Sequence, residues 1–527
     1  MLDFMYKWVL PFSIVLFLVM VSFRVTANPI EEIVVVGSKK STGYSDPEYH
    51  DTAIQAIKPT MVYQAGGPGG FTGVSLNGTD SKHTLVYRNG VPVNDPSSGW
   101  YDLGTEVPTR QTYEVYSGSN GALFGSSSMA GTVFIEDTFD KHVFYKGGDR
   151  LQFISGGNEW FQISRYKGSI GSVMTTNSEE DWFENTTLKT KAKYGGFDVV
   201  MVSQDYDYDY DDCLYGSSIE YNDCNQSGYK VDISIKRDDW LTLGYNVNSA
   251  QYNLGSGTKS NRIYVDTKRQ LTKNLLIGVT GQQEQYDFYF RSPVPITHKD
   301  NRTGIYTSWT KLSENYNVGL GYRYEDEKHI FRLGTEIKDV KFQIANSFRS
   351  PNLYEIFGDD YVQPNHNLKA EESKGIEISY KKLSLFRYEF SEGIDYDFNN
   401  RQYINTGSYN SQGIKYKYTR EGFVFSASYT DSDIIRKAKY KTLISYFGMF
   451  GKIDYQLSYV GEFDRGLDFD GRPIDNISTF QFNLGYYLSP DYRVGLHMRD
   501  VLNRNFEILP GYAAGGREIF ITFNLSI

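Results

Sequence analysis

Apolar and polar residues alternate in the last segment of the chain, residues 519–527. Every second residue there is apolar, and most of the residues between them are polar. A period of two places the two sets on opposite faces of an extended β-strand. The apolar face consists of Ile519, Ile521, Phe523, Leu525 and Ile527. We therefore expect a closing strand with one apolar face.

The same alternation recurs from about residue 140 onwards. Residues 480–486 and 494–498 show it on either side of the turn Ser489-Pro490-Asp491, and residues 340–344 and 376–380 repeat it. A soluble β-sandwich also has alternating, half-buried strands. Here the residues opposite the apolar face are mostly Gln, Asn, Ser and Thr, over most of the chain. This is typical of a transmembrane β-barrel with a polar interior.

The composition supports an all-β membrane protein. The 527 residues include 44 Tyr, 33 Phe and 50 Gly, and the net charge is −10. The mean hydropathy of −0.47 is low, as expected where lipid-facing and lumen-facing residues alternate, and aromatic girdles enrich Tyr and Phe. The acidic balance argues against a nucleic-acid partner. Two Cys cannot form a disulfide scaffold at this length.

The N-terminal residues 1–27 have the three parts of a signal peptide. Lys7 supplies the positive flank, residues 8–23 are apolar, and Val25-Thr26-Ala27 is a small-residue cleavage pattern. The alternative is a membrane anchor helix, but its apolar run is short and Pro11 and Arg24 lie at its ends. We expect cleavage after Ala27, and no later apolar run is long enough for a membrane helix.

The segment Ile30 to Gly37 would then open the mature chain. Its β-branched apolar residues favour an extended conformation. It is either an ordinary first strand or a peptide that adds itself to the open sheet edge of another protein. Residues 53–137 that follow are Gly-rich with short strand-like pieces, which indicates a small globular domain.

Several motifs resemble a known family in their residues and in their order. Asn346 to Glu355, residues 367–373 and Asp500 to Asn503 lie in the expected barrel, and the globular domain carries Tyr63–Gly70, Leu85–Pro96, Tyr113–Gly118, Ala122–Ser126 and Met129–Val133. Together they are similar to the TonB-dependent outer-membrane receptors. The resemblance covers the whole mature chain and is greatest to the BtuB-type cobalamin receptors.

This resemblance implies a 22-stranded antiparallel transmembrane β-barrel over residues 138–527, with residues 53–137 as a plug inside its lumen. About 18 residues remain for each strand and its connection, so the loops are short. Residues 28–52 then contain the TonB box and a linker, and TonB would pair with the box by strand addition. The box comprises Ile30, Glu31, Glu32, Ile33, Val34, Val35 and Val36. We expect a monomer in the lipid of the bacterial outer membrane.

Three polar residues depart from the family pattern in the plug. Asn77 stands where an Arg is usual, Asn89 where an Asp is usual, and Ser117 where another Arg is usual. The charged residues would help to seat the plug through ion pairs with the barrel wall. We therefore expect a plug that is held differently. The chain also ends in Ile527, where outer-membrane barrels more often end in an aromatic residue.

An acidic stretch at residues 205–212 alternates Asp with Tyr. In an extended chain its Asp residues share one face, and their carboxylates repel one another unless a cation lies between them. Carboxylate oxygens are hard ligands, which suit Ca²⁺. The candidate ligands are Asp181, Glu184, Asp207, Asp209, Asp211 and Asp223. This acidic arrangement resembles the early extracellular loops of the cobalamin receptors, which bind calcium. The alternative is a solvated acidic rim whose Tyr residues face lipid headgroups.

The two cysteines lie just beyond this stretch. Cys213 and Cys224 would close a small loop in an oxidising compartment, and this would stabilise the fold by roughly 3 kcal/mol. Free buried thiols are the alternative.

No catalytic constellation is evident. The seven His lack ligand spacing, and the Gly clusters lack the Lys-Ser or Lys-Thr of a phosphate loop. We predict that the protein is not an enzyme and needs no cofactor beyond the candidate Ca²⁺. An outer-membrane barrel hydrolase and a passive pore are the distant alternatives.

The resemblance implies active uptake of a large, scarce nutrient that binds at the plug apex. The expected contacts are Gly69, Gly70, Phe71, Asn94, Ser97, Ser98 and Trp100. Aromatic lining suits a large, partly apolar ligand, and few basic residues at the apex argue against an anionic ferric chelate. We predict cobalamin or a related corrinoid as the substrate, with a siderophore, haem or another metal chelate as the alternative.

Overall fold

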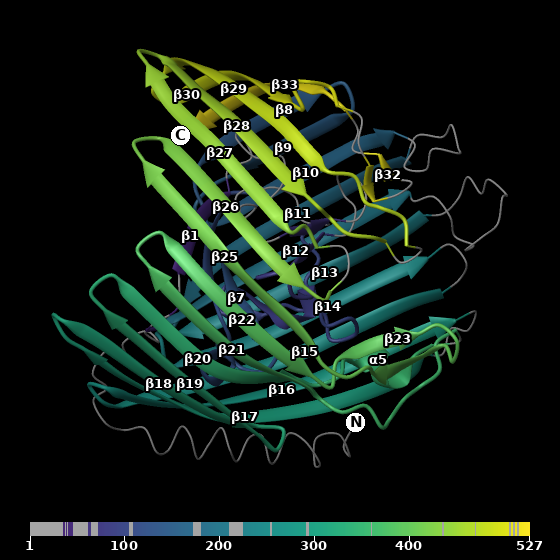
Figure 1. The fold of residues 1–527 in the computed structure, drawn as a ribbon. Helices are drawn as coiled ribbons and strands as arrows, with labels where there is room; N and C mark the ends of the chain where they lie inside the picture. The colour runs from purple at the N-terminus through teal and green to yellow at the C-terminus, as the bar shows by residue number, and fades with distance from the viewer. Residues whose placement is uncertain are drawn as a thin grey trace. The chain divides into compact units, whose positions relative to one another are not determined.

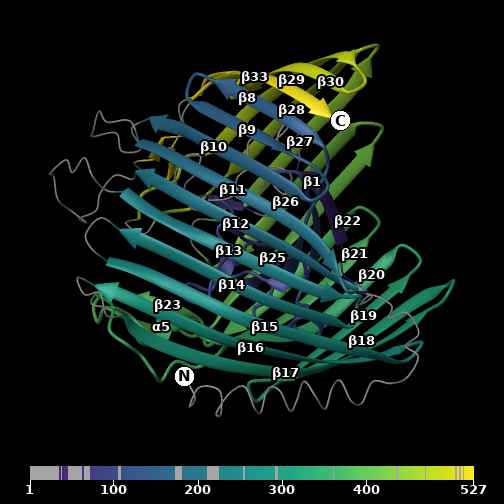
Figure 2. The same cartoon turned by 180° about the vertical axis from the view of Figure 1, so that it is seen from behind.

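A computed structural model describes most of the chain (Figures 1 and 2). The described residues are 35–36, 38, 40–45, 62–64, 72–104, 109–171, 181–209, 225–252, 256–290, 295–359, 361–434, 437–468, 471–504, 507–509, 512–513 and 516–526. Residues 33–527 form one compact unit.

Twenty-two antiparallel strands close into a barrel, as predicted. The ring is completed where the last strand pairs with the first, with Phe520 opposite Gly148. In barrel order the strands are β8 (His142–Gly148), β9 (Leu151–Gly157), β10 (Phe161–Gly171), β11 (Asp181–Tyr194), β12 (Phe197–Asp209), β13 (Asn225–Arg237), β14 (Leu241–Tyr252), β15 (Ser256–Thr272), β16 (Leu275–Phe290), β17 (Ile296–Leu312), β18 (Tyr316–Glu325), β19 (Lys328–Ile337), β20 (Val340–Arg349), β21 (Glu371–Tyr380), β22 (Leu383–Ser391), β25 (Tyr409–Arg420), β26 (Phe423–Ser432), β27 (Tyr440–Phe450), β28 (Ile453–Phe463), β29 (Ile477–Ser489), β30 (Tyr492–Arg499) and β33 (Glu518–Ser526).

The strands follow the two-sided pattern of the sequence. In β33 the side chains of Ile519, Ile521 and Phe523 are exposed on the outer surface, and those of Phe520 and Thr522 are buried towards the lumen. Strand β21 repeats this order along its whole length. The apolar face suits the lipid and the polar face suits the lumen, while closure of the sheet lets the strands satisfy one another's backbone hydrogen bonds.

The connections differ between the two ends of the barrel. At one end short turns join the strands, such as Gly195-Gly196 between β11 and β12. At the other end several connections are longer, and residues 350–370 between β20 and β21 contain the helix α5 (Leu353–Phe357). Two hairpins extend from this end, β23 (Ile394–Asp397) with β24 (Gln402–Asn405), and β31 (Glu507–Leu509) with β32 (Tyr512–Ala513). Short periplasmic turns and longer extracellular loops are the usual arrangement.

A small domain inside the barrel contains a five-stranded sheet. The strands are ordered β1 (Lys40–Ser45), β6 (Gln111–Ser117), β7 (Gly131–Asp137), β4 (Thr84–Arg88) and β5 (Val91–Pro92). The short elements β2 (Val62–Gln64), β3 (Thr72–Val74), η2 (Ser81–His83) and α4 (Gly121–Phe124) complete it. Val74, Leu76, Val86, Val133 and Ile135 belong to its apolar core.

This domain has hydrogen bonds to strands around the barrel wall. Ser234 of β13 donates to the carbonyl of Asn89, Arg262 of β15 to that of Pro92, and Ser411 of β25 to that of Asn77. The domain therefore occupies the lumen as a plug (Figure 2). Strand β1 lies within the segment expected to be a linker, and the domain limits at residues 52 and 137 stay a prediction. No helix in the described part of the chain is long and apolar enough to cross a membrane.

The outer face makes a depth-dependent prediction. Ile344 lies in the middle of β20 and is 47% exposed, whereas Val340 is the first residue of the same strand. Ile344→Arg should destabilise the barrel by about 2–4 kcal/mol because it places a charge near the bilayer centre, and Val340→Arg by about 0–1 kcal/mol. Denaturant unfolding in lipid vesicles measures both. Equal costs would mean that β20 does not cross the bilayer in this orientation.

Candidate functional site

The plug apex is the tight segment Asn94 to Trp100. The Asp95 carboxylate accepts from the Ser97 amide at 2.6 Å, and the Asp95 amide donates to the Trp100 carbonyl at 2.8 Å. Asn94 is buried, and its side chain bonds to the main chain of Val86, Thr84 and Gly99. Asn94 thus shapes the apical segment, while Ser97, Ser98 and Trp100 are partly exposed.

A large pocket lies between this apex and the wall strands β12 to β15. Its volume is about 360 Å³, and it contains four of the residues that we predicted to contact substrate: Asn94, Ser97, Ser98 and Trp100. The wall contributes Tyr206, Tyr208, Lys230, Asp232, Asn246 and Asn248, among others. Gly69, Gly70 and Phe71 lie outside the described residues. The substrate role of all seven stays a prediction.

The pocket is rich in acceptors. Asp95, Asp102 and Asp232 line it together with one ammonium group, that of Lys230. Burial raises the pKa of Asp102 above its usual value, although Lys230 opposes this shift. The side-chain oxygens of Asn246 and Asn248 are buried without a protein partner. Such a lining suits a ligand with many hydrogen-bond donors and no large negative charge.

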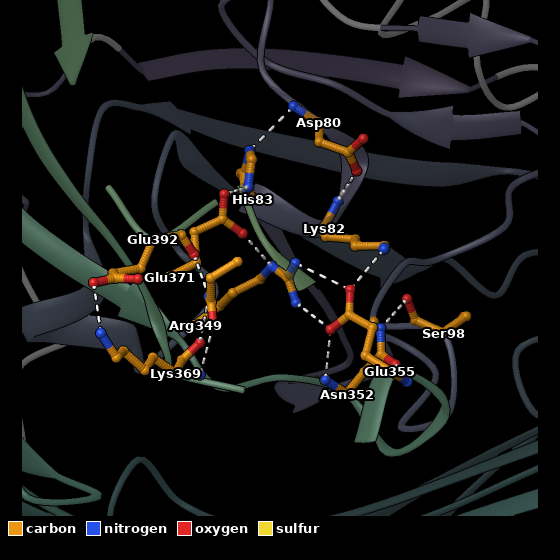
Figure 3. Close-up of polar contacts among 12 residues, drawn as sticks. Asp80, Lys82, His83, Ser98, Arg349, Asn352, Glu355, Lys369, Glu371 and Glu392 are labelled. Atoms are coloured by element: carbon orange, nitrogen blue, oxygen red, sulfur yellow. Dashed lines mark hydrogen bonds and ion pairs between the residues drawn. The ribbon is translucent and has the colours of Figure 1, made fainter. Parts of the chain in front are cut away.

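A buried ion network holds the long 350–370 connection onto the plug apex (Figure 3). Arg349 at the end of β20 donates to Glu355 of α5 at 2.7 and 3.1 Å and to Glu371 of β21 at 2.8 Å. Lys82 of the plug donates to Glu355 at 2.8 Å. All four side chains are at least 87% buried. We name this set, Lys82, Arg349, Glu355 and Glu371, the apical clamp.

Main-chain contacts support the clamp. The amides of Leu353 and Tyr354 donate to the carbonyls of Pro96 and Ser97, at 3.2 and 3.1 Å. The Asn352 side chain donates to the Ser98 carbonyl at 2.9 Å and caps α5 through the Glu355 amide (Figure 3). The connection with α5 is therefore fixed to the segment that faces the pocket.

His83 joins the clamp to the plug interior. Its Nδ1 accepts from the Asp80 amide at 3.1 Å, and its Nε2 lies 3.1 Å from Glu371. An imidazole that accepts at Nδ1 carries its proton on Nε2, so the neutral ring can donate to Glu371. The Lys82 ammonium also lies 5.6 Å from the Trp100 ring centre, which links the clamp to the pocket.

We name the contact of Asn77 and Ser117 with Glu377 of the barrel wall the plug seat. Asn77 donates to Glu377 of β21 at 3.1 Å, and Ser117 donates to the same carboxylate at 2.8 Å. Tyr388 of β22 adds a third neutral donor at 2.5 Å. Lys415 of β25 reaches from the wall to the Asn77 side-chain oxygen. At both positions, Asn77 and Ser117, the plug thus offers a neutral donor to the wall carboxylate.

The third departure, Asn89, also bonds within the plug. Its side chain donates to Asp137 at 2.7 Å and accepts from the Asp137 amide at 3.0 Å, with a left-handed φ of 48°. Asn tolerates this conformation, so the residue closes the turn between β4 and β5.

The acidic candidates lie on the outer face, near the end with the long connections. Glu184 and Asp207 are paired across β11 and β12, and Arg165 of β10 contacts Glu184 at 2.5 Å. Tyr206 is buried on the opposite face, and Tyr208 packs with the buried aromatic residues of the lumen. The alternative in which these two tyrosines face lipid headgroups is therefore wrong, because the strand register turns the Asp residues outward instead.

Several of the predicted calcium and disulfide positions lie outside the described residues. Among the residues with described side chains, no group of three or more His, Cys, Asp or Glu could hold a metal ion. The side chains of Asp181 and Asp209 fall outside the described set, as do Asp211, Asp223, Cys213 and Cys224. Calcium and the disulfide stay predictions.

The residues of the apical clamp were not singled out from the sequence. The motif at 346–355 contains Arg349 and Glu355, and the motif at 367–373 contains Glu371. Charged residues at lumen-facing positions of these motifs could have indicated a buried ion network. Lys82 had no comparable signal, because its partner Glu355 lies 273 positions away.

The clamp makes a prediction about pH and mutation. Burial disfavours the charged form of Glu355, but Arg349 and Lys82 outweigh it and hold its pKa below the usual 4.5. A lowered pKa means that the stabilisation is present at neutral pH and is lost as the pH falls below about 4.5. Glu355→Gln should expose the 350–370 connection to protease already at pH 7. Glu392→Gln, at an exposed pair with Lys369, is the matched control and should change nothing.

Comparison with known proteins agrees with this architecture. Residues 71–515 match the family described as TonB dependent receptor-like, beta-barrel. The structure is similar to the siderophore receptor PirA of Acinetobacter baumannii, with a TM-score of 0.68 at 13% identity, over 94% of this chain and 100% of that chain. It is also similar to a mutant of the ferric enterobactin receptor PfeA of Pseudomonas aeruginosa, with a TM-score of 0.69 at 12% identity, over 94% and 100%.

A third similar structure is the ferric yersiniabactin uptake receptor FyuA of Yersinia pestis, with a TM-score of 0.65 at 14% identity, over 93% of this chain and 98% of that chain. At these identities the structural likeness establishes the fold alone, whereas the family match spans most of the sequence. The chain belongs to the TonB-dependent receptors, and it is an outer-membrane transport protein, not an enzyme.

Proposed function

We propose that this receptor takes up cobalamin or a related corrinoid across the outer membrane, driven by TonB. The observation that carries the proposal is the lining of the pocket, of about 360 Å³, between the plug apex and β12–β15. It combines Trp100, Tyr101, Tyr206 and Tyr208 with carboxylates and free amide oxygens. A corrinoid presents a broad ring for stacking and many amide N–H donors for these acceptors.

The second candidate is a ferric siderophore. The similar solved structures are named as siderophore receptors, which favours this class. The lining argues for the corrinoid, because three carboxylates against one Lys disfavour an anionic ferric chelate.

In the proposed mechanism the substrate binds at the apex and the TonB box, residues 30–36, becomes available in the periplasm. TonB adds a strand to it and transmits force to the plug. We further propose a cleaved signal peptide at 1–27, a Cys213–Cys224 disulfide and Ca²⁺ held by the acidic residues near β11 and β12. Titration with Ca²⁺ should raise substrate affinity, and Asp207→Ala with Asp211→Ala should remove that effect.

Deletion of residues 30–36 tests the coupling. Uptake of cyanocobalamin by cells that lack their own receptor should fall to background, because the pairing strand is missing, while binding to the purified protein stays unchanged. Undiminished uptake by the deletion variant would contradict TonB-driven transport and favour a passive pore.

A binding screen with cyanocobalamin, haem and ferric siderophores tests the substrate. Trp100→Ala should weaken cyanocobalamin binding by about tenfold or more, since buried aromatic anchors contribute much of the binding energy. Trp160→Ala, at an exposed turn distant from the pocket, is the matched control. Binding of a ferric siderophore without any binding of cyanocobalamin would replace the corrinoid proposal with the second candidate.

A further inference from the structure

Val36, the last residue of the expected TonB box, is buried against the barrel wall with 2% of its surface exposed. Two glycines form the wall at this point. A Cβ added to Gly334 of β19 would lie 1.9 Å from the Val36 carbonyl oxygen, and one added to Gly319 of β18 would lie 3.0 Å from the Val36 Cβ. The wall thus has a shallow groove beside Val36, and only glycine at positions 319 and 334 leaves room for it.

Arg332 of β19 holds the same segment by hydrogen bonds. It is 3% exposed and donates through Nη2 to the Val36 carbonyl at 2.6 Å and to the Ser38 hydroxyl at 2.8 Å. Through Nε it donates to the Asn120 side chain at 3.0 Å. Gln343 of β20 supplies a fourth acceptor at 3.4 Å. Within the described residues, all of these acceptors are neutral.

A buried guanidinium with neutral acceptors depends strongly on each of them. If residues 36–38 moved away, Arg332 would lose two acceptors in a region that water enters poorly, and an unsatisfied buried charge is costly. Two effects therefore hold the segment in place. One is the contacts that it makes, and the other is the cost of leaving the Arg332 guanidinium buried without these acceptors.

Arg332 is linked to the plug seat through Asn120, whose side chain donates to the Ser117 carbonyl at 3.4 Å. Ser38 donates to Asn120 at 3.1 Å and to Gln343 at 2.6 Å, and Gln343 donates to the Ser119 carbonyl at 2.6 Å. Ser119 and Asn120 follow Ser117, which bonds Glu377. One continuous set of hydrogen bonds therefore joins the box end, the plug loop 117–120 and the wall. The cations of this set, Arg332 and Lys415, come from the wall and not from the plug.

The plug loop continues into α4, which reaches a second cavity. Asn120 directly precedes α4, and Phe124 to Ser127 at its other end line a small cavity of about 70 Å³ beneath the 350–370 connection. The helix packs against β18, β19 and β20. A shift of α4 at the cavity would therefore move Asn120 relative to Arg332.

We propose that Arg332 is a positioning residue that holds the end of the TonB box inside the barrel and ties this hold to the seat of the plug. The inference rests on the proposed function, in that TonB must reach the box. It assigns the position of Val36, at the end of the box, to one wall arginine and to the groove at Gly319 and Gly334.

The test uses the full-length receptor in detergent without substrate. The readouts are the affinity for the purified periplasmic domain of TonB and the rate at which trypsin cleaves near Lys40. Arg332→Gln and Gly334→Ala should each raise the affinity at least tenfold and speed cleavage, because both release Val36 by different means. Arg332→Lys should have a smaller effect, since it keeps the charge but loses the fork. Gly156→Ala, whose Cβ would find its nearest neighbour at 3.6 Å, is the control.

An unchanged affinity and cleavage rate in folded Arg332→Gln would overturn the proposal, and so would a change confined to Gly334→Ala. Should Arg332→Gln fail to assemble, Arg332→Lys is judged by the same rule. A purely structural loss would lower TonB binding, which is the opposite sign. The outcome is separable from the proposed function, because failure here leaves the wild-type requirement for residues 30–36 intact.

Discussion

Burial of polar and charged groups between the plug and the barrel wall is the constraint on which the rest of this structure depends. A transmembrane barrel turns its apolar residues to lipid, so its lumen is polar and the plug must match it group by group. Asp137 illustrates this at the end of β7. Arg88 of the plug and Lys189 of β11 both contact it, at 2.8 and 2.5 Å. These two cations outweigh burial and hold the pKa of Asp137 well below its usual value.

The apex and the seat satisfy this constraint in different ways. At the apex, Arg349, Lys82, Glu355 and Glu371 form a charged network in which each carboxylate has two cationic or hydrogen-bonding neighbours. Removing one partner of such a network leaves an uncompensated charge, so it is rigid. At the seat, Glu377 meets only neutral donors from the plug, Asn77 and Ser117. Neutral hydrogen bonds are easier to exchange for water, which suits an interface that must open during transport.

The sequence predicted the features that depend on local patterns. Alternation in segments such as 519–527 indicated the strands and their apolar face, and the ordered motifs in residues 63–133 indicated the plug. The alternation of Asp and Tyr in the acidic stretch does not show which of the two faces outward. The strand register decides whether Asp205 or Tyr206 does so. Asp205 faces outward and Tyr206 lines the pocket.

Long-range pairings could not be read from the sequence. Lys82 meets Glu355 and Arg332 meets Val36 across 273 and 296 positions, and no local period links them. The departures at Asn77 and Ser117 predicted neutral donors at these two positions of the plug. These two positions could not indicate that Arg332 and Lys415 of the wall would bond to the plug. That depends on which strands of the closed barrel lie beside the plug loop.

The positions of these groups suggest how one plug can be both secure and movable. The charged clamp lies beside the pocket, where Lys82 also approaches the Trp100 ring. Arg332 lies beside Val36 at the end of the box, and Asn120 links it to the seat, where the plug has only neutral donors. The pocket that Trp100 lines is therefore near the charged clamp, and α4 connects a cavity beneath the 350–370 connection to Asn120 at the other end. Because the two cations at the seat, Arg332 and Lys415, belong to the wall, the plug can leave the seat without moving these charges, which lowers the desolvation cost of that separation.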